Sequence, residues 1–217
     1  MIIRSCGENI ELYCLTENPS GLDSRINPIP LLDNSLTGWW QKLTLFQPDV
    51  HGLSGDFLYV DLDVVIVADL APLFNVAPGK FVIGQDLQTG EFNSSVFRIR
   101  IGQHPEVWSS FQQDRANIIA SMHGDQDWIS RSLQGAELWP DGWVVSFKKQ
   151  CSARVSRSWG VLGRTLRKSG LMQPKGEAII PDGARVVQFH GKPDPEDVMN
   201  GPYGLYRAAP WIKRYWY

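Results

Sequence analysis

Two acidic residues lie in the most apolar run of the chain. The segment GDFLYVDLDVVIV, residues 55–67, places Asp61 and Asp63 two positions apart. Burying a carboxylate is costly unless it is paired or binds a metal ion. In an extended strand, residues i and i+2 face the same side, so the two carboxylates are predicted to project together. Such a pair forms half of a site for Mg²⁺ or Mn²⁺. The alternative is two solvated acids at an exposed strand end.

A histidine near the other end of the chain is a candidate third ligand. The segment VVQFHGKP places His190 directly after a β-rich run, followed by Gly191 and Lys192. Glycine lets the backbone approach a ligand closely, and lysine is a point charge suited to phosphate. A lone histidine is also often structural. The residues by themselves therefore leave a ligand role and a structural role open.

The pattern along the chain predicts strands that alternate with helices. Runs rich in β-branched and aromatic residues predict strands at 10–16, 57–67, 81–84, 95–101, 143–147 and 185–189. Amphipathic patterns predict helices at 36–46, 105–122, 126–133 and 156–169. This alternation predicts an α/β sheet flanked by helices. The apolar residues around the acid pair predict a central parallel strand buried on both faces, and ligands of such sheets collect at the carboxyl ends of strands.

Composition narrows the functional class. The chain has 217 residues, of which 43% are hydrophobic and 20% charged, with a net charge of -2. This length suits one compact domain, and the charge provides no basic surface for nucleic acid. Three cysteines without paired spacing indicate neither a disulfide framework nor a zinc cluster. No apolar run reaches the length that spans a bilayer, and the first residues do not read as a signal peptide. We expect a cytoplasmic protein with a small-molecule partner, and a homo-oligomer is left open.

Four segments resemble a known family, and they occur in that family's order. FLYVDLDVVIVADLAPLF resembles the YLDxDxxxxxDLxxLF segment of family 8 and related glycosyltransferases of the GT-A fold. FNSSVFRI resembles their FNSGV strand, HGDQDWIS their DQDxxN segment, and FHGKPDP a shortened form of their closing HxxGxxKPW motif. The segments LYCLTENPSGLD and GWWQKLTLF are also similar to a bacterial branch of these nucleotide-diphospho-sugar transferases.

The resemblance implies a fold and an activity. It implies one GT-A-like (Rossmann-like) domain over residues 1–217, with a mixed, mainly parallel sheet flanked by helices. The activity would be metal-dependent transfer of a hexose from a nucleotide-diphospho-sugar, with a UDP-sugar favoured, to a glycan or other acceptor. By family resemblance the transfer would retain the anomeric configuration and serve surface polysaccharide synthesis. At most, peripheral contact with a membrane is expected.

Residue by residue, the resemblance also implies a site. It makes Asp61, Asp63 and His190 the ligands of Mn²⁺ or Mg²⁺ and brings Lys192 to the diphosphate. Its other implied members are the substrate-binding residues Lys42, Asp86 and Asn93 and the catalytic residues Asp125 and Gln126. From its position alone, Asp125 is also a good candidate for an N-terminal helix cap.

The chain departs from the family pattern at three places. Only nine residues precede the run at Ile10, which resembles the family's second strand, so we expect an N-terminally short domain without the first strand and helix. Either the true start lies upstream, or the chain is a remnant whose nucleotide pocket is open or filled by a partner. Ser95 replaces the glycine of FNSGV, and no aromatic residue follows Pro193. One alternative function is therefore a non-catalytic sugar-nucleotide or glycan-binding remnant. Another is a metal-dependent phosphodiesterase or nuclease, because paired carboxylates also serve two-metal chemistry.

Overall fold

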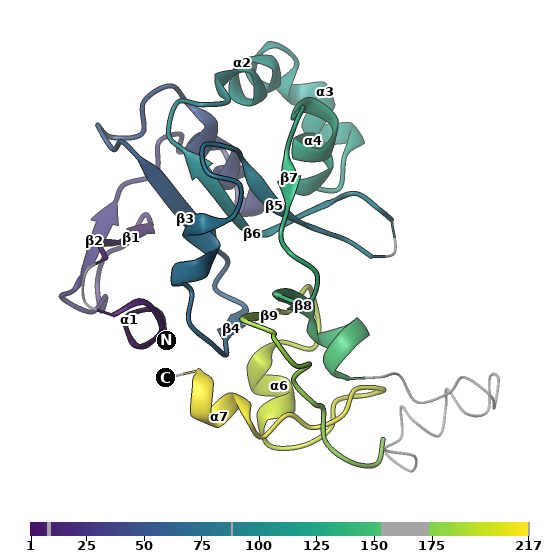
Figure 1. Cartoon of the computed structure of the whole chain (residues 1–217). Coiled ribbons are helices and arrows are strands. Elements are labelled where there is room, and N and C mark those ends of the chain that lie inside the picture. The colour runs from purple at the N-terminus through teal and green to yellow at the C-terminus, as the bar shows by residue number, and fades with distance from the viewer. Residues whose placement is uncertain (8–9, 88, 153–173, 217) are drawn as a thin grey trace. The chain divides into compact units, whose positions relative to one another are not determined.

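The chain forms two compact units, each built from segments that are distant in sequence. The computed structural model describes residues 1–7, 10–87, 89–152 and 174–216. Unit 1 comprises Met1–Gly7, Val60–Pro72 and Pro140–Tyr217, and unit 2 comprises Glu8–Tyr59 and Leu73–Trp139 (Figure 1). Both units contain strands and helices, as the sequence predicted. A single GT-A-like domain over residues 1–217 stays a prediction.

Unit 2 contains a sheet of four strands and a separate pair. The strands of the sheet lie in the order β3 (Asp56–Val60), β6 (Phe92–Arg100), β5 (Val82–Gln85) and β7 (Glu137–Leu138). Strand β5 is antiparallel to β6 and parallel to β7. The pair consists of β1 (Leu12–Leu15) and β2 (Ile26–Ile29), which run parallel. The residues of β6 from Asn93 to Ile99 are all buried, so both faces of this strand are covered.

Helices of unit 2 pack on the sheet through an aromatic core. These helices are the 3₁₀-helix η1 (Gly38–Phe46) and the α-helices α2 (Pro105–Gln113), α3 (Arg115–Ser121) and α4 (Asp125–Ser132). Figure 1 shows α2, α3 and α4 grouped together. In the core, the rings of Phe46 and Tyr59 stack on Phe97 at centroid distances of 6.0 and 4.7 Å. Burial of these rings holds η1 against the sheet.

The helix predicted at 105–122 is wrong in one respect, because it is divided at Asp114. This residue has φ −136° and ψ 31°, which is not helical. Its carboxylate accepts a hydrogen bond from Asn117 Nδ2 at 2.6 Å. Aspartate is disfavoured in the interior of a helix, because its side chain forms hydrogen bonds with nearby polar groups when the backbone is not helical. The amphipathic pattern continued through Asp114, so the pattern alone did not reveal the break.

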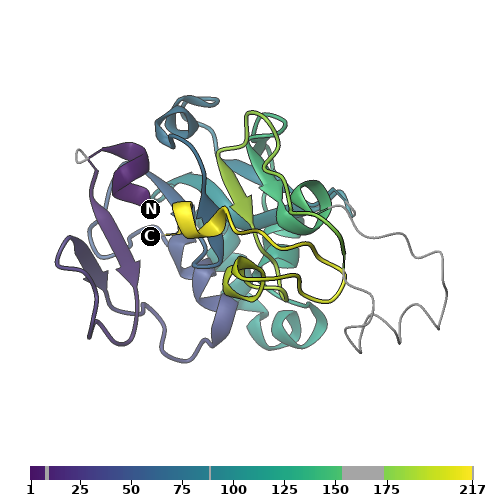
Figure 2. The ribbon, with the colours of Figure 1, turned by 90° about the horizontal axis from the view of Figure 1, so that it is seen from below.

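Unit 1 contains a three-stranded sheet with its own core. The order is β4 (Val64–Ile66), β9 (Val186–Gln188) and β8 (Val144–Ser146), with β9 antiparallel to β4 and parallel to β8. Its described helical segments include α1 (Ile2–Cys6), the π-helix η3 (Phe147–Cys151), α6 (Pro195–Met199) and α7 (Ile212–Tyr215). Phe147 stacks on Phe189 with ring centroids 4.4 Å apart. Arg4 of α1 donates hydrogen bonds to the carbonyls of Arg214 and Tyr215, and α1 and α7 lie side by side in Figures 1 and 2.

The long strand predicted at 57–67 is wrong, because the chain turns between β3 and β4. Strand β3 ends at Val60 and β4 begins at Val64, with a turn at Leu62 and Asp63. Leu62 is 90% exposed. Asp61 and Asp63 are therefore half-buried residues of a connection, and not of a strand covered on both faces. A turn lets both carboxylates reach the surface, which avoids the cost of burying them within an apolar strand.

The other predicted elements fall close to their expected places. Strands are confirmed within or overlapping 10–16, 81–84, 95–101, 143–147 and 185–189, and helices within or overlapping 36–46 and 126–133. The helix predicted at 156–169 lies outside the described residues. Across the described ranges of the chain, no helix is both long enough and apolar enough to cross a membrane.

Cys151 is expected to be chemically inert in the folded protein. Its side chain is buried in the core of unit 1, and this burial raises the pKa of its thiol from 9.0 to about 12. The thiolate is the reactive form, so native Cys151 should react with iodoacetamide at pH 8 at least about tenfold more slowly than half-buried Cys14. Mass spectrometry of the labelled peptides gives both rates. Labelling of native Cys151 at the rate of Cys14 would contradict this assignment.

The same pKa has a consequence for stability in alkali. The folded pKa of Cys151 lies above the unfolded one, so its stabilising contribution is fully present below pH 9 and is lost as the pH rises toward about 12. The urea midpoint of the wild type should therefore fall over this range more steeply than that of Cys151→Ala, which has no group to titrate at this position.

Candidate functional site

The predicted site residues fall into two groups, one in each unit. Unit 1 holds the proposed metal and diphosphate residues Asp61, Asp63, His190 and Lys192, and unit 2 holds Lys42, Asp86, Asn93, Asp125 and Gln126.

In unit 1, strand pairing brings the acid pair and the histidine segment to one edge of the sheet. Val64 is the register partner of Gln188, and the N–H of Phe189 donates to the carbonyl of Asp63 at 3.2 Å. The antiparallel pairing therefore continues one residue beyond β4, and His190 follows directly. Strand β8 is parallel to β9 and ends at the same edge, where Ser146 Oγ lies 3.4 Å from His190 Nε2.

Lys192 is held locally by two acids. Its ammonium lies 2.6 Å from Asp194 Oδ2 and 2.9 Å from Asp197 Oδ2, and its side chain is 59% exposed. The hydrogen bonds to Asp194 and then Asp197 raise the pKa of Lys192, so it is charged at neutral pH. The two acids form the capping box of α6. Because exposed ion pairs contribute little to stability, a phosphate group can replace these partners at small cost.

The edge of unit 1 offers chemistry that fits a divalent cation. Gln188, the last residue of β9, is 4% exposed, and its Oε1 accepts no hydrogen bond in the part of the chain that the structure describes. A buried acceptor without a partner costs about 1–3 kcal/mol. Amide, carboxylate and imidazole groups all bind Mn²⁺. Among the described residues, however, no three His, Cys, Asp or Glu side chains are gathered closely enough to hold a metal ion. The types of ligand atom therefore suit a divalent cation, but the side chains are not gathered into one coordination site.

In unit 2, a buried ion pair joins η1 to α4. Lys42 Nζ lies 3.3 Å from Asp125 Oδ2, and each side chain is 6% exposed. The ammonium also donates to the carbonyl and to the hydroxyl of Ser94, at 3.2 and 3.1 Å. The ring of Tyr59 lies beside it, with 5.1 Å between Nζ and the ring centroid. The lysine predicted to reach a donor is thus directed at Asp125.

Asp125 is not a helix cap, so the alternative interpretation of this residue is wrong. Helix α4 begins at Asp125, so its N-cap position is occupied by Gly124, and no side chain caps this end of the helix. The Asp125 carboxylate instead accepts a hydrogen bond from Ser94 Oγ at 2.7 Å. The partial positive charge at the start of α4 also favours a carboxylate there. Asp125 is therefore a buried anion that is stabilised from two directions.

The remaining predicted residues of unit 2 differ in their surroundings. Asn93 is buried, and its Oδ1 accepts from the N–H of Ser95 at 3.1 Å. Gln126 is half-buried, and its Oε1 accepts from the N–H of Ser94 at 3.4 Å. Asp86 lies in the hairpin between β5 and β6, where its Oδ1 accepts from the N–H of Thr89 at 3.1 Å. The structure thus brings Lys42, Asp125 and Gln126 together at Ser94 of β6. It places Asn93 beside Ser94 in the same strand, in contact with Ser95, and Asp86 in a turn.

Sequence reasoning missed two polar residues of these groups. Ser94 contacts both Lys42 and Asp125, and Gln188 holds the buried oxygen at the edge of unit 1. The segment FNSSVF contained a signal for the first, since a serine in an otherwise apolar strand needs a polar partner. A glutamine between valine and phenylalanine in VVQFH gave the same kind of signal for the second.

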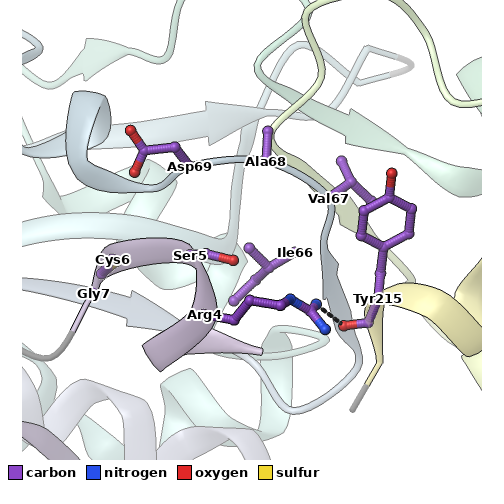
Figure 3. A pocket seen from close by; sticks show the side chains of 9 residues that line it. All are labelled: Arg4, Ser5, Cys6, Gly7, Ile66, Val67, Ala68, Asp69 and Tyr215. Carbon is purple, nitrogen blue, oxygen red and sulfur yellow. Dashed lines mark hydrogen bonds between the residues drawn. The ribbon is translucent and has the colours of Figure 1, made fainter.

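A separate hollow lies at the other end of β4. This cavity has a volume of about 370 Å³ and is lined by residues 4–7, residues 66–69 and Tyr215 (Figure 3). Figure 3 shows the Arg4 guanidinium bonded to the backbone oxygen of Tyr215 beside this cavity. Its lining includes none of the predicted site residues. The hollow and the proposed metal edge therefore flank opposite ends of the same short strand.

Comparison with known proteins relates the fold to solved glycosyltransferases. No protein-family model and no curated protein matches the sequence. The structure is similar to that of an active-site mutant of LgtC, with a TM-score of 0.55 and 16% identity over 89% of this chain and 81% of that one. It is also similar to the galactosyltransferase LgtC in complex with donor and acceptor sugar analogs, with a TM-score of 0.54, 16% identity and the same coverage. The chain thus has the mixed α/β fold, with sheets flanked by helices, of these GT-A-like glycosyltransferases.

Proposed function

We propose that this protein is a glycosyltransferase of the GT-A type. It would transfer a sugar from a nucleotide-diphospho-sugar, with UDP favoured, to a glycan or other acceptor. The observation that carries the proposal is the pairing of β4 with β9. This pairing brings the turn that contains Asp61 and Asp63 to the same sheet edge as the segment His190–Lys192. The similar LgtC structure contains donor and acceptor sugar analogs, which supports a sugar donor and an acceptor for this chain.

Unit 1 carries the residues proposed for the metal and the diphosphate. Asp61, Asp63 and His190 would hold Mn²⁺ or Mg²⁺, with the buried oxygen of Gln188 close in sequence to the histidine. A bound divalent cation supplies positive charge that stabilises the departing diphosphate. Lys192 carries a positive charge on an exposed side chain. It can therefore exchange its ion pairs with Asp194 and Asp197 for a contact with a phosphate oxygen.

Unit 2 carries the residues proposed for the sugar. Cleavage of an anomeric C–O bond develops positive charge on the sugar ring, and an ionised carboxylate nearby stabilises that charge. Asp125 is assigned this role, with Gln126 and Asn93 as hydrogen-bonding groups for sugar hydroxyls. Lys42 acts on the sugar through Asp125, with which it is paired. A donor contact for Asp86, retention of configuration, a cytoplasmic location and a place in surface polysaccharide synthesis belong to the proposal through family resemblance.

The first test is metal-dependent binding of a nucleotide sugar. Calorimetry with common UDP- and GDP-sugars should detect binding in the presence of Mn²⁺ and lose it on addition of EDTA. Asp63→Asn removes one proposed ligand charge, so we expect affinity to fall at least about tenfold, which corresponds to about 1.4 kcal/mol. Asp182→Asn is the matched control, because Asp182 is an exposed acid in the turn before β9 and lies away from the proposed metal edge.

The outcomes separate the proposed function from its alternatives. Equal loss of affinity in the Asp63 and Asp182 variants, or no binding of any nucleotide sugar by the wild type, would overturn the metal-dependent donor site. Binding without detectable transfer to sugars or to water would indicate a sugar-nucleotide-binding protein that is not a catalyst. Cleavage of a phosphodiester that Asp63→Asn abolishes would indicate phosphoryl transfer instead.

A further inference from the structure

Ser94 contacts three of the residues assigned to the sugar. It is 3% exposed and lies near the start of β6. Its hydroxyl donates to Asp125 Oδ2 at 2.7 Å and accepts from Lys42 Nζ at 3.1 Å. Its carbonyl accepts a second bond from Lys42 at 3.2 Å, and its N–H donates to Gln126 Oε1 at 3.4 Å. One buried serine thus uses its hydroxyl, carbonyl and N–H to hold side chains from η1 and α4.

The direction of the hydrogen bonds through the hydroxyl is fixed by its partners. An ammonium group only donates, and an ionised carboxylate only accepts. The Ser94 hydroxyl must therefore accept from Lys42 and donate its proton to Asp125. The hydrogen bonds from Lys42 to Ser94 and from Ser94 to Asp125 thus form a chain from the cation to the anion, and such chained bonds strengthen each other in a buried site. An alanine would leave the ion pair of 3.3 Å without this bridge.

The contacts of Asp125 leave one side of its carboxylate for a ligand. Within the described residues, the ion pair with Lys42 and the bond from Ser94 both use Oδ2. Fixing Oδ2 between two donors also fixes the orientation of Oδ1. We propose that Ser94 is a positioning residue that sets the orientation of Asp125 and Gln126 toward the sugar. This inference rests on the proposed function.

The chain provides a matched control in the next residue. Ser95 is also buried and lies in the same strand, but successive residues of a strand face opposite sides. Its backbone N–H binds Asn93, and not Lys42 or Asp125. Ser94→Ala and Ser95→Ala therefore each remove one buried hydroxyl from β6, and only the first removes the bridge.

The first measurement follows the Lys42 ammonium in the ligand-free protein. Nuclear magnetic resonance of ¹⁵N-lysine-labelled protein detects ammonium groups that are hydrogen-bonded and shielded from water, and Lys42→Met assigns the signal. We expect the Lys42 signal in the wild type and in Ser95→Ala, and at least tenfold faster proton exchange in Ser94→Ala. Unchanged exchange in Ser94→Ala, or an equal change in Ser95→Ala, would overturn the positioning role.

The second measurement follows sugar transfer or donor hydrolysis by the same variants. Misplacing a catalytic group by about 1 Å can cost about a hundredfold in rate, so we expect kcat of Ser94→Ala to fall about tenfold to a hundredfold. The KM for the donor should change less, and Ser94→Thr should restore much of kcat. A merely structural role would lower the melting temperature and leave kcat per folded molecule unchanged. Full kcat in Ser94→Ala would overturn the inference. Absence of both reactions in the wild type would instead overturn the proposed function, while the ammonium exchange would still decide whether Ser94 holds Lys42.

Discussion

Arg98→Leu is expected to lower the free energy of unfolding by about 3–5 kcal/mol, because it removes a buried charge that four carbonyl groups share. Arg98 is 2% exposed. One guanidinium nitrogen donates to the carbonyls of Leu73 and Phe74 at 3.1 and 2.7 Å. The other donates to those of Ala77 and Lys80 at 2.7 and 3.1 Å. Leucine would remove this donor from all four carbonyls of a partly buried loop, although the Ala77 carbonyl would still accept from the N–H of Lys80 at 3.1 Å.

The loop that Arg98 contacts contains a residue with an unfavourable backbone conformation. Ala77 has φ 39°, a left-handed value that side-chain-bearing residues rarely adopt. Such a residue persists only when its surroundings fix it, and the bond from Arg98 to the Ala77 carbonyl is one such restraint. Burial lowers the pKa of Arg98 from its ordinary value, but arginine remains protonated near neutral pH. The charged guanidinium therefore stays available to all four carbonyls.

Urea denaturation of three variants tests this role. Arg98→Lys keeps the charge but cannot span four acceptors with a planar fork, so we expect a loss smaller than that of Arg98→Leu but above about 1 kcal/mol. Arg100→Leu is the matched control. Arg100 lies two residues further along β6 and forms an exposed ion pair of 2.8 Å with Asp56, which should contribute about 1 kcal/mol or less. If Arg98→Leu lies within 1 kcal/mol of Arg100→Leu, the carbonyls do not depend on Arg98.

Sequence patterns predicted the elements better than they predicted the breaks between them. The runs around β5, β8 and β9 have the β-branched composition of buried strands, and the structure confirms them. Residues 57–67 have the same composition, yet the chain turns at Leu62 and Asp63. Apolar periodicity records which residues are buried, whereas a turn depends on where polar residues must leave the interior. A pair of acids in an apolar run was therefore a signal of a break as well as of a ligand.

The candidate site shows the limit of local patterns even more clearly. Ser94 and Lys42 are 52 residues apart, and Ser94 and Asp125 are 31 apart. The family resemblance identified Lys42 and Asp125 separately, but nothing in their spacing showed that they form an ion pair. The sequence position of Asp125 also allowed a helix cap, but the N-cap of α4 is Gly124, and Asp125 pairs with Lys42. Side-chain partners from different elements follow from packing, which a single sequence does not specify.

The second large effect concerns this ion pair. Lys42→Met is expected to destabilise the protein by about 3–5 kcal/mol, because it leaves the Asp125 carboxylate buried with one donor in place of two. Asp125→Leu should cost a similar amount, since it removes the carboxylate that lies 3.3 Å from the buried ammonium. The double variant Lys42→Met/Asp125→Leu removes both charges and should cost clearly less than the sum of the two single changes.

A double-mutant cycle in urea measures this coupling. We expect a coupling energy of at least about 2 kcal/mol, within the range found for residues that share a buried network. Lys192→Met is the control for an exposed pair, because Lys192 is 59% exposed beside Asp194 and Asp197 and should contribute about 1 kcal/mol or less. A coupling energy below about 0.5 kcal/mol would contradict a buried pair. A stable double variant that no longer transfers sugar would place the pair in the reaction, because its loss of activity could not be a loss of folding.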